Sequence, residues 1–180
     1  RLDLAVAPAA ECGPNQMSVY DSNMHTQFVR RQSIAMDLQT ALEKHELEVR
    51  YRPTYCLKEG RFTRADSYMR IFIQGIGLVG AAEFLPIAED SGQILAICYY
   101  ALDHAGKSIA ELLASRSEFD SICIPVSLIL LLQEDFIDQV KRVIETCQIP
   151  EGKLALEVDD HALSSVYLTV NITMQELYDM

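Results

Sequence analysis

Residues 47–72, LEVRYRPTYCLKEGRFTRADSYMRIF, decide how the chain folds. Two apolar-rich runs, residues 47–57 and 62–72, flank a short polar connection that contains Gly60. Such a connection between two β-prone runs is typical of a β-hairpin, which we predict here. Because an unpaired charge is costly to bury, we expect four interrupting side chains to be paired, solvated or directed at a ligand: Arg50, Arg52, Asp66 and Arg70.

Patterns of helix and strand alternate around this hairpin. Apolar periodicity predicts helices over residues 22–46, 93–115 and 134–147 and strands over residues 120–128 and 154–159. Three shorter segments complete the chain: a glycine-rich loop over 75–80, a short helix or turn over 81–90, and a helix over 174–180 capped by Thr173. Strands alternating with helices favour an α/β fold of about four strands, with a parallel sheet and crossover helices.

The composition limits the partners and the compartment. The length of 180 residues suits about one domain, and the net charge of −11 argues against non-specific binding to DNA or to an anionic membrane. The five cysteines are widely spread without a C-x-x-C pair, and most lie in apolar runs, which favours buried thiols in a reducing compartment. We therefore expect a cytoplasmic segment without membrane contact.

Acidic side chains lie where parallel strands are expected to end. Ligands of α/β sheets bind at the carboxyl ends of the strands, and carboxylates gathered there suit Mg²⁺ or Mn²⁺. Asp66 and Glu157 are flanked by apolar residues, which predicts that both are buried. Asp159 and Asp160 are more simply explained as solvated residues at a strand exit.

Arg70 follows Asp66 by four residues, on the same face of the predicted strand. Two interpretations stay open: an ion pair between these side chains, or a contact from Arg70 to a phosphate beside a metal site. The histidines are scattered, and the order of residues supports neither a Ser-His-Asp nor a Cys-His catalytic set.

Six stretches together resemble the first part of EAL domains, the bacterial cyclic di-GMP phosphodiesterases built on a modified TIM barrel. The most specific is EFLPIAEDSG at residues 83–92, and the others are LEVRYRP (47–53), LKEGR (57–61), ADSYMR (65–70), PVSL (125–128) and LALEVDD (154–160). The resemblance covers residues 24–180. It implies the N-terminal part of such a barrel, an incomplete barrel of about four strands with flanking helices.

The residues before this region resemble the end of a GGDEF domain. Residues 1–21 are then the C-terminal tail of a GGDEF-like domain with its linker, and residues 22–180 the N-terminal portion of an EAL-like domain. The chain is accordingly expected to be part of a tandem GGDEF–EAL protein.

The resemblance assigns roles position by position. Glu157 keeps a metal-ligand glutamate and Arg70 keeps the phosphate-contacting arginine of the family. Asp66 stands in place of the metal-ligand glutamate of Glu-Ala-Leu and is one methylene shorter, Ser127 replaces a metal-ligand asparagine, and Arg52 replaces a substrate-side glutamine. The later catalytic segment of the family, which begins with D-D-F-G, is expected beyond Met180. Since a two-metal site needs several fixed ligands, these departures predict a degenerate site.

The resemblance therefore implies three functions. The domain is expected to regulate by contact with a protein partner or a second copy, or to be a receptor that binds cyclic di-GMP through Arg70 and Arg52 without cutting it. The alternative is a metal-dependent phosphodiesterase that converts cyclic di-GMP to pGpG. We expect no cofactor, with Mg²⁺ or Mn²⁺ at Asp66 and Glu157 only if the site is functional.

Overall fold

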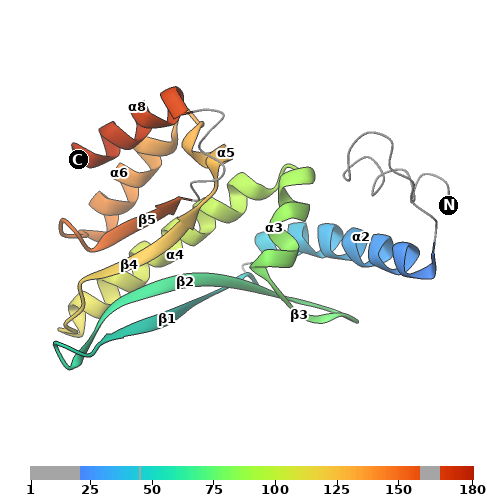
Figure 1. Ribbon diagram of the computed structural model, residues 1–180, viewed down its shortest axis with the longest axis horizontal. Helices are drawn as coiled ribbons and strands as arrows, with labels where there is room; N and C mark the ends of the chain where they lie inside the picture. The colour runs from blue at the N-terminus through green and yellow to red at the C-terminus, as the bar shows by residue number, and fades with distance from the viewer. Residues whose placement is uncertain (1–20, 45, 159–166) are drawn as a thin grey trace.

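The computed structural model of the protein describes residues 21–44, 46–158 and 167–180 and shows a mixed α/β fold (Figure 1). Its strands are β1 (Glu48–Cys56), β2 (Arg61–Ile73), β3 (Gly77–Gly80), β4 (Ser121–Val126) and β5 (Leu154–Val158). Its helices are α2 (Ser22–Glu43), α3 (Ala81–Asp90), α4 (Ile94–Ala114), α5 (Leu128–Leu131), α6 (Phe136–Cys147) and α8 (Tyr167–Tyr178). The predicted α/β class is confirmed as a partial sheet with flanking helices.

In the part of the chain that the structure describes, five strands form one sheet in the order β1-β2-β4-β5, with β3 paired to β2 outside this path. β1 and β2 are antiparallel, which confirms the predicted hairpin, while β4 and β5 run parallel to β2. β3 corrects the loop predicted over residues 75–80. Its Leu78 and Val79 pair with β2, because the turn is shorter than predicted and is made by Gly75 and Gly77 at positive φ.

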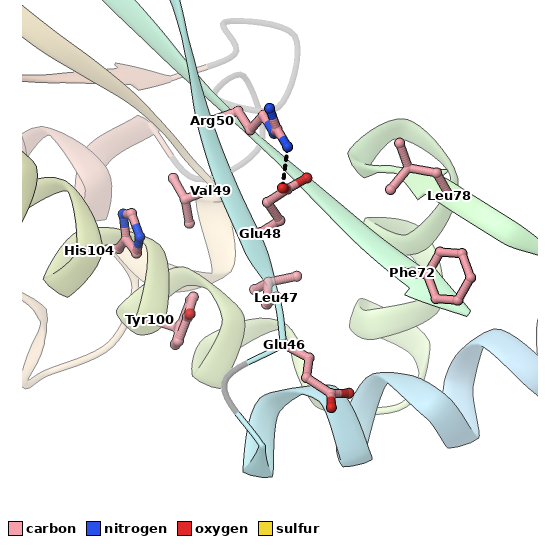
Figure 2. A pocket seen from close by; sticks show the side chains of 9 residues that line it. All are labelled: Glu46, Leu47, Glu48, Val49, Arg50, Phe72, Leu78, Tyr100 and His104. Carbon is pink, nitrogen blue, oxygen red and sulfur yellow. Dashed lines mark hydrogen bonds and ion pairs between the residues drawn. The ribbon is translucent and has the colours of Figure 1, made fainter. Parts of the chain in front are cut away.

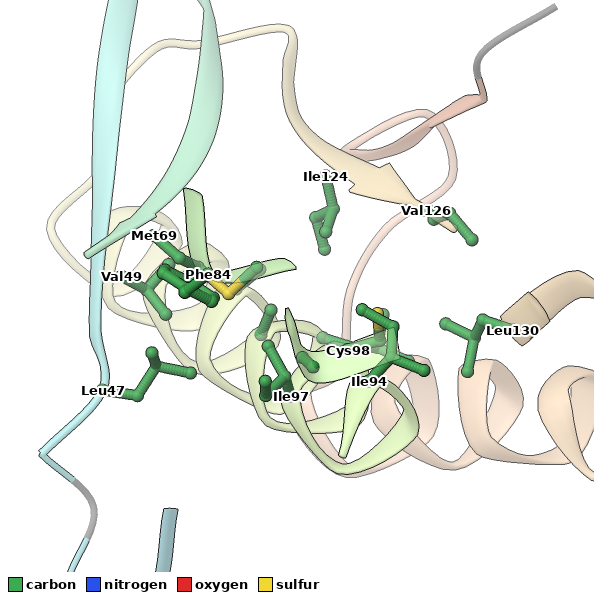
Figure 3. Packing of buried hydrophobic residues seen from close by; sticks show 14 of the residues in the cluster. Leu47, Val49, Met69, Phe84, Ile94, Ile97, Cys98, Ile124, Val126 and Leu130 are labelled. Carbon is green, nitrogen blue, oxygen red and sulfur yellow. The ribbon is translucent and has the colours of Figure 1, made fainter. Parts of the chain in front are cut away.

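The two faces of the sheet differ in composition. Val49, Met69 and Ile71 are buried, and Figure 3 shows Val49 and Met69 gathered with Phe84 of α3 in the core. Because side chains alternate along a strand, the intervening residues lie on the other side. We call this side the open face; it carries Arg52, Arg64, Asp66, Tyr68 and Arg70 of the hairpin, Cys123 of β4 and Glu157 of β5. In a closed barrel with its helices outside, this face lines the interior.

Helix α4 is the centre of the core, and its predicted extent over residues 93–115 is confirmed within one residue at each end. It packs against β4 and against α6. The close approach of α4 to α6 depends on Gly106, where a Cβ atom would lie 2.5 Å from Cγ1 of Val143. The absence of a side chain at Gly106 therefore allows α4 and α6 to pack this closely.

Helix ends show where local prediction was accurate and where it was not. The predicted N-cap cluster of α2 is confirmed, because Asp21 accepts the backbone N–H of Met24 at 2.9 Å. The strand predicted over 120–128 ends at Val126, because Ser127 is the N-cap of α5, which begins at Leu128. Helix α8 begins before Thr173, whose hydroxyl donates to the carbonyl of Leu131 at 3.2 Å and is therefore not a cap.

Some of the predicted features concern residues that the structure does not describe. Asp159 and Asp160 lie outside the described residues, as does the GGDEF-like tail up to residue 20, so the domain boundary after residue 21 stays a prediction. Within the described ranges, no helix combines the length and the apolar character that a membrane crossing needs.

Candidate functional site

The neighbours of β2 change in the middle of the strand. One edge of β2 pairs with β4 at residues 64–66 and with β3 at residues 70–73. Residues 67–69 lie between these pairings, on the carboxyl side of the parallel segment. Because ligands of α/β sheets bind at the carboxyl ends of strands, where the strand order changes, this fork is the expected place for a site.

Two guanidinium groups flank the ring of Tyr68 at this fork. Cζ of Arg70 lies 5.2 Å from the ring centre, and Cζ of Arg52 lies 5.5 Å from it. The electron-rich face of an aromatic ring attracts cations at such distances. Among the described residues neither arginine forms an ion pair with a carboxylate, whereas the neighbouring Arg50 pairs with Glu48. The structure thus brings together the two arginines that the sequence suggested for ligand binding.

The ion pair considered between Arg70 and Asp66 is not formed. Residues four apart on a strand are separated by about 13 Å, while residues two apart are separated by about half of that. Asp66 therefore pairs with its nearer neighbour, accepting a hydrogen bond from Nε of Arg64 at 3.0 Å. Arg70 instead lies opposite Glu48 of β1, where its charge adds to the effect of the Arg50 hydrogen bond that lowers the pKa of Glu48.

The predicted metal ligands Asp66 and Glu157 converge on a third residue, Cys123. One ligand atom from each of the three lies within 4.8 Å of the other two, and the Cys123 thiol donates to Oε2 of Glu157 across 3.8 Å. Sequence reasoning missed Cys123. The sequence offered the alternation of faces along β4, but the parallel register that places Cys123 beside Asp66 comes from the structure.

Both carboxylates are more exposed than predicted. The Asp66 side chain is 43% exposed, and Glu157 is also exposed. The expectation that their apolar neighbours imply burial is wrong, because the side chains of Ala65 and Val158 point to the opposite face of the sheet. Cys123, by contrast, is buried.

The electrostatics of the cluster follow from these positions. Burial raises the pKa of the Cys123 thiol, although the charge of Arg64 opposes that rise. Interactions with Cys123 and with Asp66 in turn raise the pKa of the Arg64 guanidinium. The cluster therefore combines a neutral thiol, a permanent cation and two carboxyl groups on one face of the sheet.

These residues do not fit a site for two hard divalent cations. Mg²⁺ and Mn²⁺ prefer oxygen ligands, but the third donor here is a thiol, and Asp66 is already bonded to Arg64. Ser127 follows the last residue of β4, and its hydroxyl accepts the backbone N–H of Ile129 at 3.2 Å. That hydroxyl acts as the N-cap of α5.

A separate hollow of about 550 Å³ lies at the free edge of β1. Figure 2 shows Tyr100 and His104 of α4 on one side of β1, and Phe72 and Leu78 on the other. The ion pair of Glu48 with Arg50, drawn between them, lowers the pKa of Glu48 through its hydrogen bond. The hollow is lined by none of the predicted ligand or metal residues, so the candidate site is the fork and the adjoining cluster.

Comparisons with known proteins agree with this architecture. A family described as the EAL domain matches residues 35–180, which begins after the predicted GGDEF-like tail. The chain is 25% identical over 158 residues to the bifunctional diguanylate cyclase/cyclic di-GMP phosphodiesterase MucR of Pseudomonas aeruginosa, covering 88% of this chain and 23% of MucR. The chain spans about a fifth to a quarter of the length of the curated relatives it matches first.

Solved structures share the fold. The phosphodiesterase PaMucR in its c-di-GMP complex superposes with a TM-score of 0.75 at 22% identity, covering 81% of this chain and 59% of that one. The FimX EAL domain from Pseudomonas aeruginosa bound to c-di-GMP has a TM-score of 0.71 at 18% identity, covering 81% of this chain and 58% of that one. At these identities the likeness concerns the fold, and ligand binding must be argued from the residues.

Proposed function

The chain belongs to the EAL domain family of cyclic di-GMP signalling proteins, and from this membership we propose that it binds cyclic di-GMP without hydrolysing it. Two similar solved structures are described with this dinucleotide bound. Cyclic di-GMP presents two phosphodiester anions and two guanine rings, so a site for it needs cations and planar surfaces close together.

The arrangement of Arg52, Tyr68 and Arg70 is the observation that carries this proposal. Both guanidinium groups lie beside one tyrosine ring on the open face, and neither is in an ion pair among the described residues. A guanidinium fork matches the paired oxygens of a phosphodiester, and a tyrosine ring provides a stacking surface for a base. We assign Arg70 and Arg52 to the phosphates and Tyr68 to a guanine.

The cluster beside this site supports the loss of hydrolysis. Hydrolysis by paired cations needs ions about 3.5–4 Å apart, each held by several fixed ligands. Here Arg64 is hydrogen-bonded to Asp66, and the third donor is the thiol of Cys123. The Ser127 hydroxyl is the N-cap of α5. The alternative function, metal-dependent conversion of cyclic di-GMP to pGpG, requires these groups to rearrange. That binding of cyclic di-GMP leads to contact with a protein partner or to a dimer stays a prediction.

Calorimetry on the full-length protein tests the binding. We expect Arg70→Ala, Arg52→Ala and Tyr68→Ala each to weaken cyclic di-GMP binding by about tenfold or more, since a charge-assisted hydrogen bond or a stacked base is worth roughly 1–3 kcal/mol. Arg142→Ala is the matched control, because Arg142 pairs with Asp103 away from the open face. No binding by the wild type, or equal affinity in all three variants, contradicts the proposal.

A second measurement tests the absence of hydrolysis. We expect the full-length protein incubated with Mg²⁺ or Mn²⁺ to leave cyclic di-GMP intact, as followed by chromatography of the linear product. Metal-dependent turnover that disappears in both Asp66→Asn and Glu157→Gln would establish the alternative function instead. Turnover that survives both substitutions would place the activity elsewhere in the full-length protein.

A further inference from the structure

Arg64 is the one cation hydrogen-bonded to the cluster of Asp66, Cys123 and Glu157 among the described residues. Arg64 lies two residues before Asp66 on the same face of β2, and its Nε donates to Oδ1 of Asp66 at 3.0 Å. Its cationic group therefore lies directly beside donor atoms that are all within 4.8 Å of one another. A set of donors at that spacing is close enough to surround a single ion.

The donors, taken without Arg64, are suited to a cation other than Mg²⁺. Two carboxylates and a sulfur form a mixed set, and a sulfur ligand favours Zn²⁺ and related ions that accept both oxygen and sulfur. The three residues come from three adjacent strands, β2, β4 and β5. Asp66 is the register partner of Cys123, and Glu157 lies on the same face two residues after Ala155, the partner of Cys123 on β5. Hydrogen-bonded strands hold such donors more firmly than loops do.

We propose that the Arg64 guanidinium takes the place of a cation among Asp66, Cys123 and Glu157, and that it thereby keeps a latent Zn²⁺-type site closed. Of the arginines on the open face, Arg64 is the one whose side chain is hydrogen-bonded to a donor of this set, Asp66, from the same strand. A divalent ion that approached the three donors would meet both the repulsion of this guanidinium and its hydrogen bond to Asp66.

The ion pair itself contributes little to folding. The side chains of Arg64 and Asp66 are 47% and 43% exposed, and exposed ion pairs contribute little to stability. Removing Arg64 should therefore leave the fold intact while it uncovers the donors. This makes the inference testable by substitution in the full-length protein.

The test is a titration with Zn²⁺ alone, in the absence of dinucleotide. We expect Arg64→Ala to bind one additional Zn²⁺, with an affinity at least about tenfold above any binding at this site in the wild type, since repulsion between a guanidinium and a divalent ion a few ångströms apart is of that order even in a high dielectric. Titration with Cd²⁺ should produce an ultraviolet thiolate-to-metal band in the same variant.

Three further variants assign the ion to these residues. Arg61→Ala is the matched control, because Arg61 lies on the same strand and pairs with Glu59 and Asp120 instead; it should behave as the wild type. Arg64→Lys retains the charge and should keep binding weak. The double variant Arg64→Ala with Cys123→Ser should lose the cadmium band, and circular dichroism checks that each variant is folded.

Two results overturn the inference: Zn²⁺ binding at this site by the wild type as tight as by Arg64→Ala, or no gain in binding by a folded Arg64→Ala. The inference rests on the proposed loss of the hydrolytic cation site, but it is measured without cyclic di-GMP. Failure of dinucleotide binding would therefore leave the Zn²⁺ result unchanged, and failure of the Zn²⁺ result would leave the role of Arg52, Tyr68 and Arg70 standing.

Discussion

The two faces of β2 differ in burial: one packs against the helices and the other is partly or fully exposed. Ile71 and Ile73 are fully buried against the helices, whereas Phe72 between them is 70% exposed, and Arg70 beside them is in no ion pair among the described residues. Residues on the buried face are constrained by packing, because interiors are close-packed and tolerate little change in volume. Most side chains of β2 on the open face are partly or fully exposed, so this constraint is weaker there.

This difference explains where function resides in the domain. The proposed ligand residues and the cluster around Cys123 all lie on the open face, and the residues that hold the sheet to α4 lie on the other. Substitutions on the buried face should therefore change stability first, and substitutions on the open face should change binding first. The predictions below concern the buried side first and the proposed ligand site last, and each is measured by the unfolding transition of the domain in the full-length protein.

The largest effect is expected from adjacent residues on opposite faces. Ile71→Ala should destabilise the domain by about 2–5 kcal/mol, because it removes buried methyl groups and leaves a cavity, whereas Phe72→Ala should stay within about 0.5 kcal/mol. Denaturant unfolding of the two variants compares them directly. Equal losses would show that the open face is also covered in the intact protein.

A close approach between helices should produce the next largest effect. Gly106→Ala places a methyl group 2.5 Å from Cγ1 of Val143, so we expect a loss of about 1–3 kcal/mol despite the higher helix propensity of alanine. Lys107→Ala, one residue later on the exposed side of α4, is the control. A neutral or stabilising Gly106→Ala would mean that α6 can move away from α4 without cost.

The buried thiol of Cys98 should make stability depend on alkaline pH. Burial raises its pKa from 9.0 to about 11, so the unfolded chain loses the proton first as the pH rises. This contribution to stability is complete below pH 9 and is lost as the pH rises towards 11, by at most about 2–3 kcal/mol. The stability deficit of Cys98→Ala should accordingly shrink between pH 8 and pH 11, and a constant deficit would contradict the assignment.

The smallest effect on stability should come from the proposed ligand site. The double variant Arg52→Ala, Arg70→Ala should unfold within about 0.5 kcal/mol of the wild type, since neither side chain has an ion-pair partner in the described part of the chain. Its affinity for cyclic di-GMP should nevertheless fall further than that of either single variant. A large loss of stability would show that these arginines serve the fold rather than a ligand.

The sequence by itself determined the elements and the family. The hairpin, α4 and α6 follow from the spacing of apolar residues, which encodes helix and strand locally, and the stretch 83–92 with its companions pointed to the EAL family that the comparison with known proteins then identified. Local pattern also gave the N-cap of α2 at Asp21. These features depend on residues close together in the chain, so they can be read without a structure.

The tertiary structure alone decided which distant side chains meet. The register between strands places Asp66 close to Cys123 and Glu157. The folded structure also shows that Asp66 pairs with Arg64 rather than with Arg70. β3 became a strand because β2 offered it an edge, although its own glycines suggested a loop. Register is set by the packing of segments far apart in sequence, which local periodicity does not record.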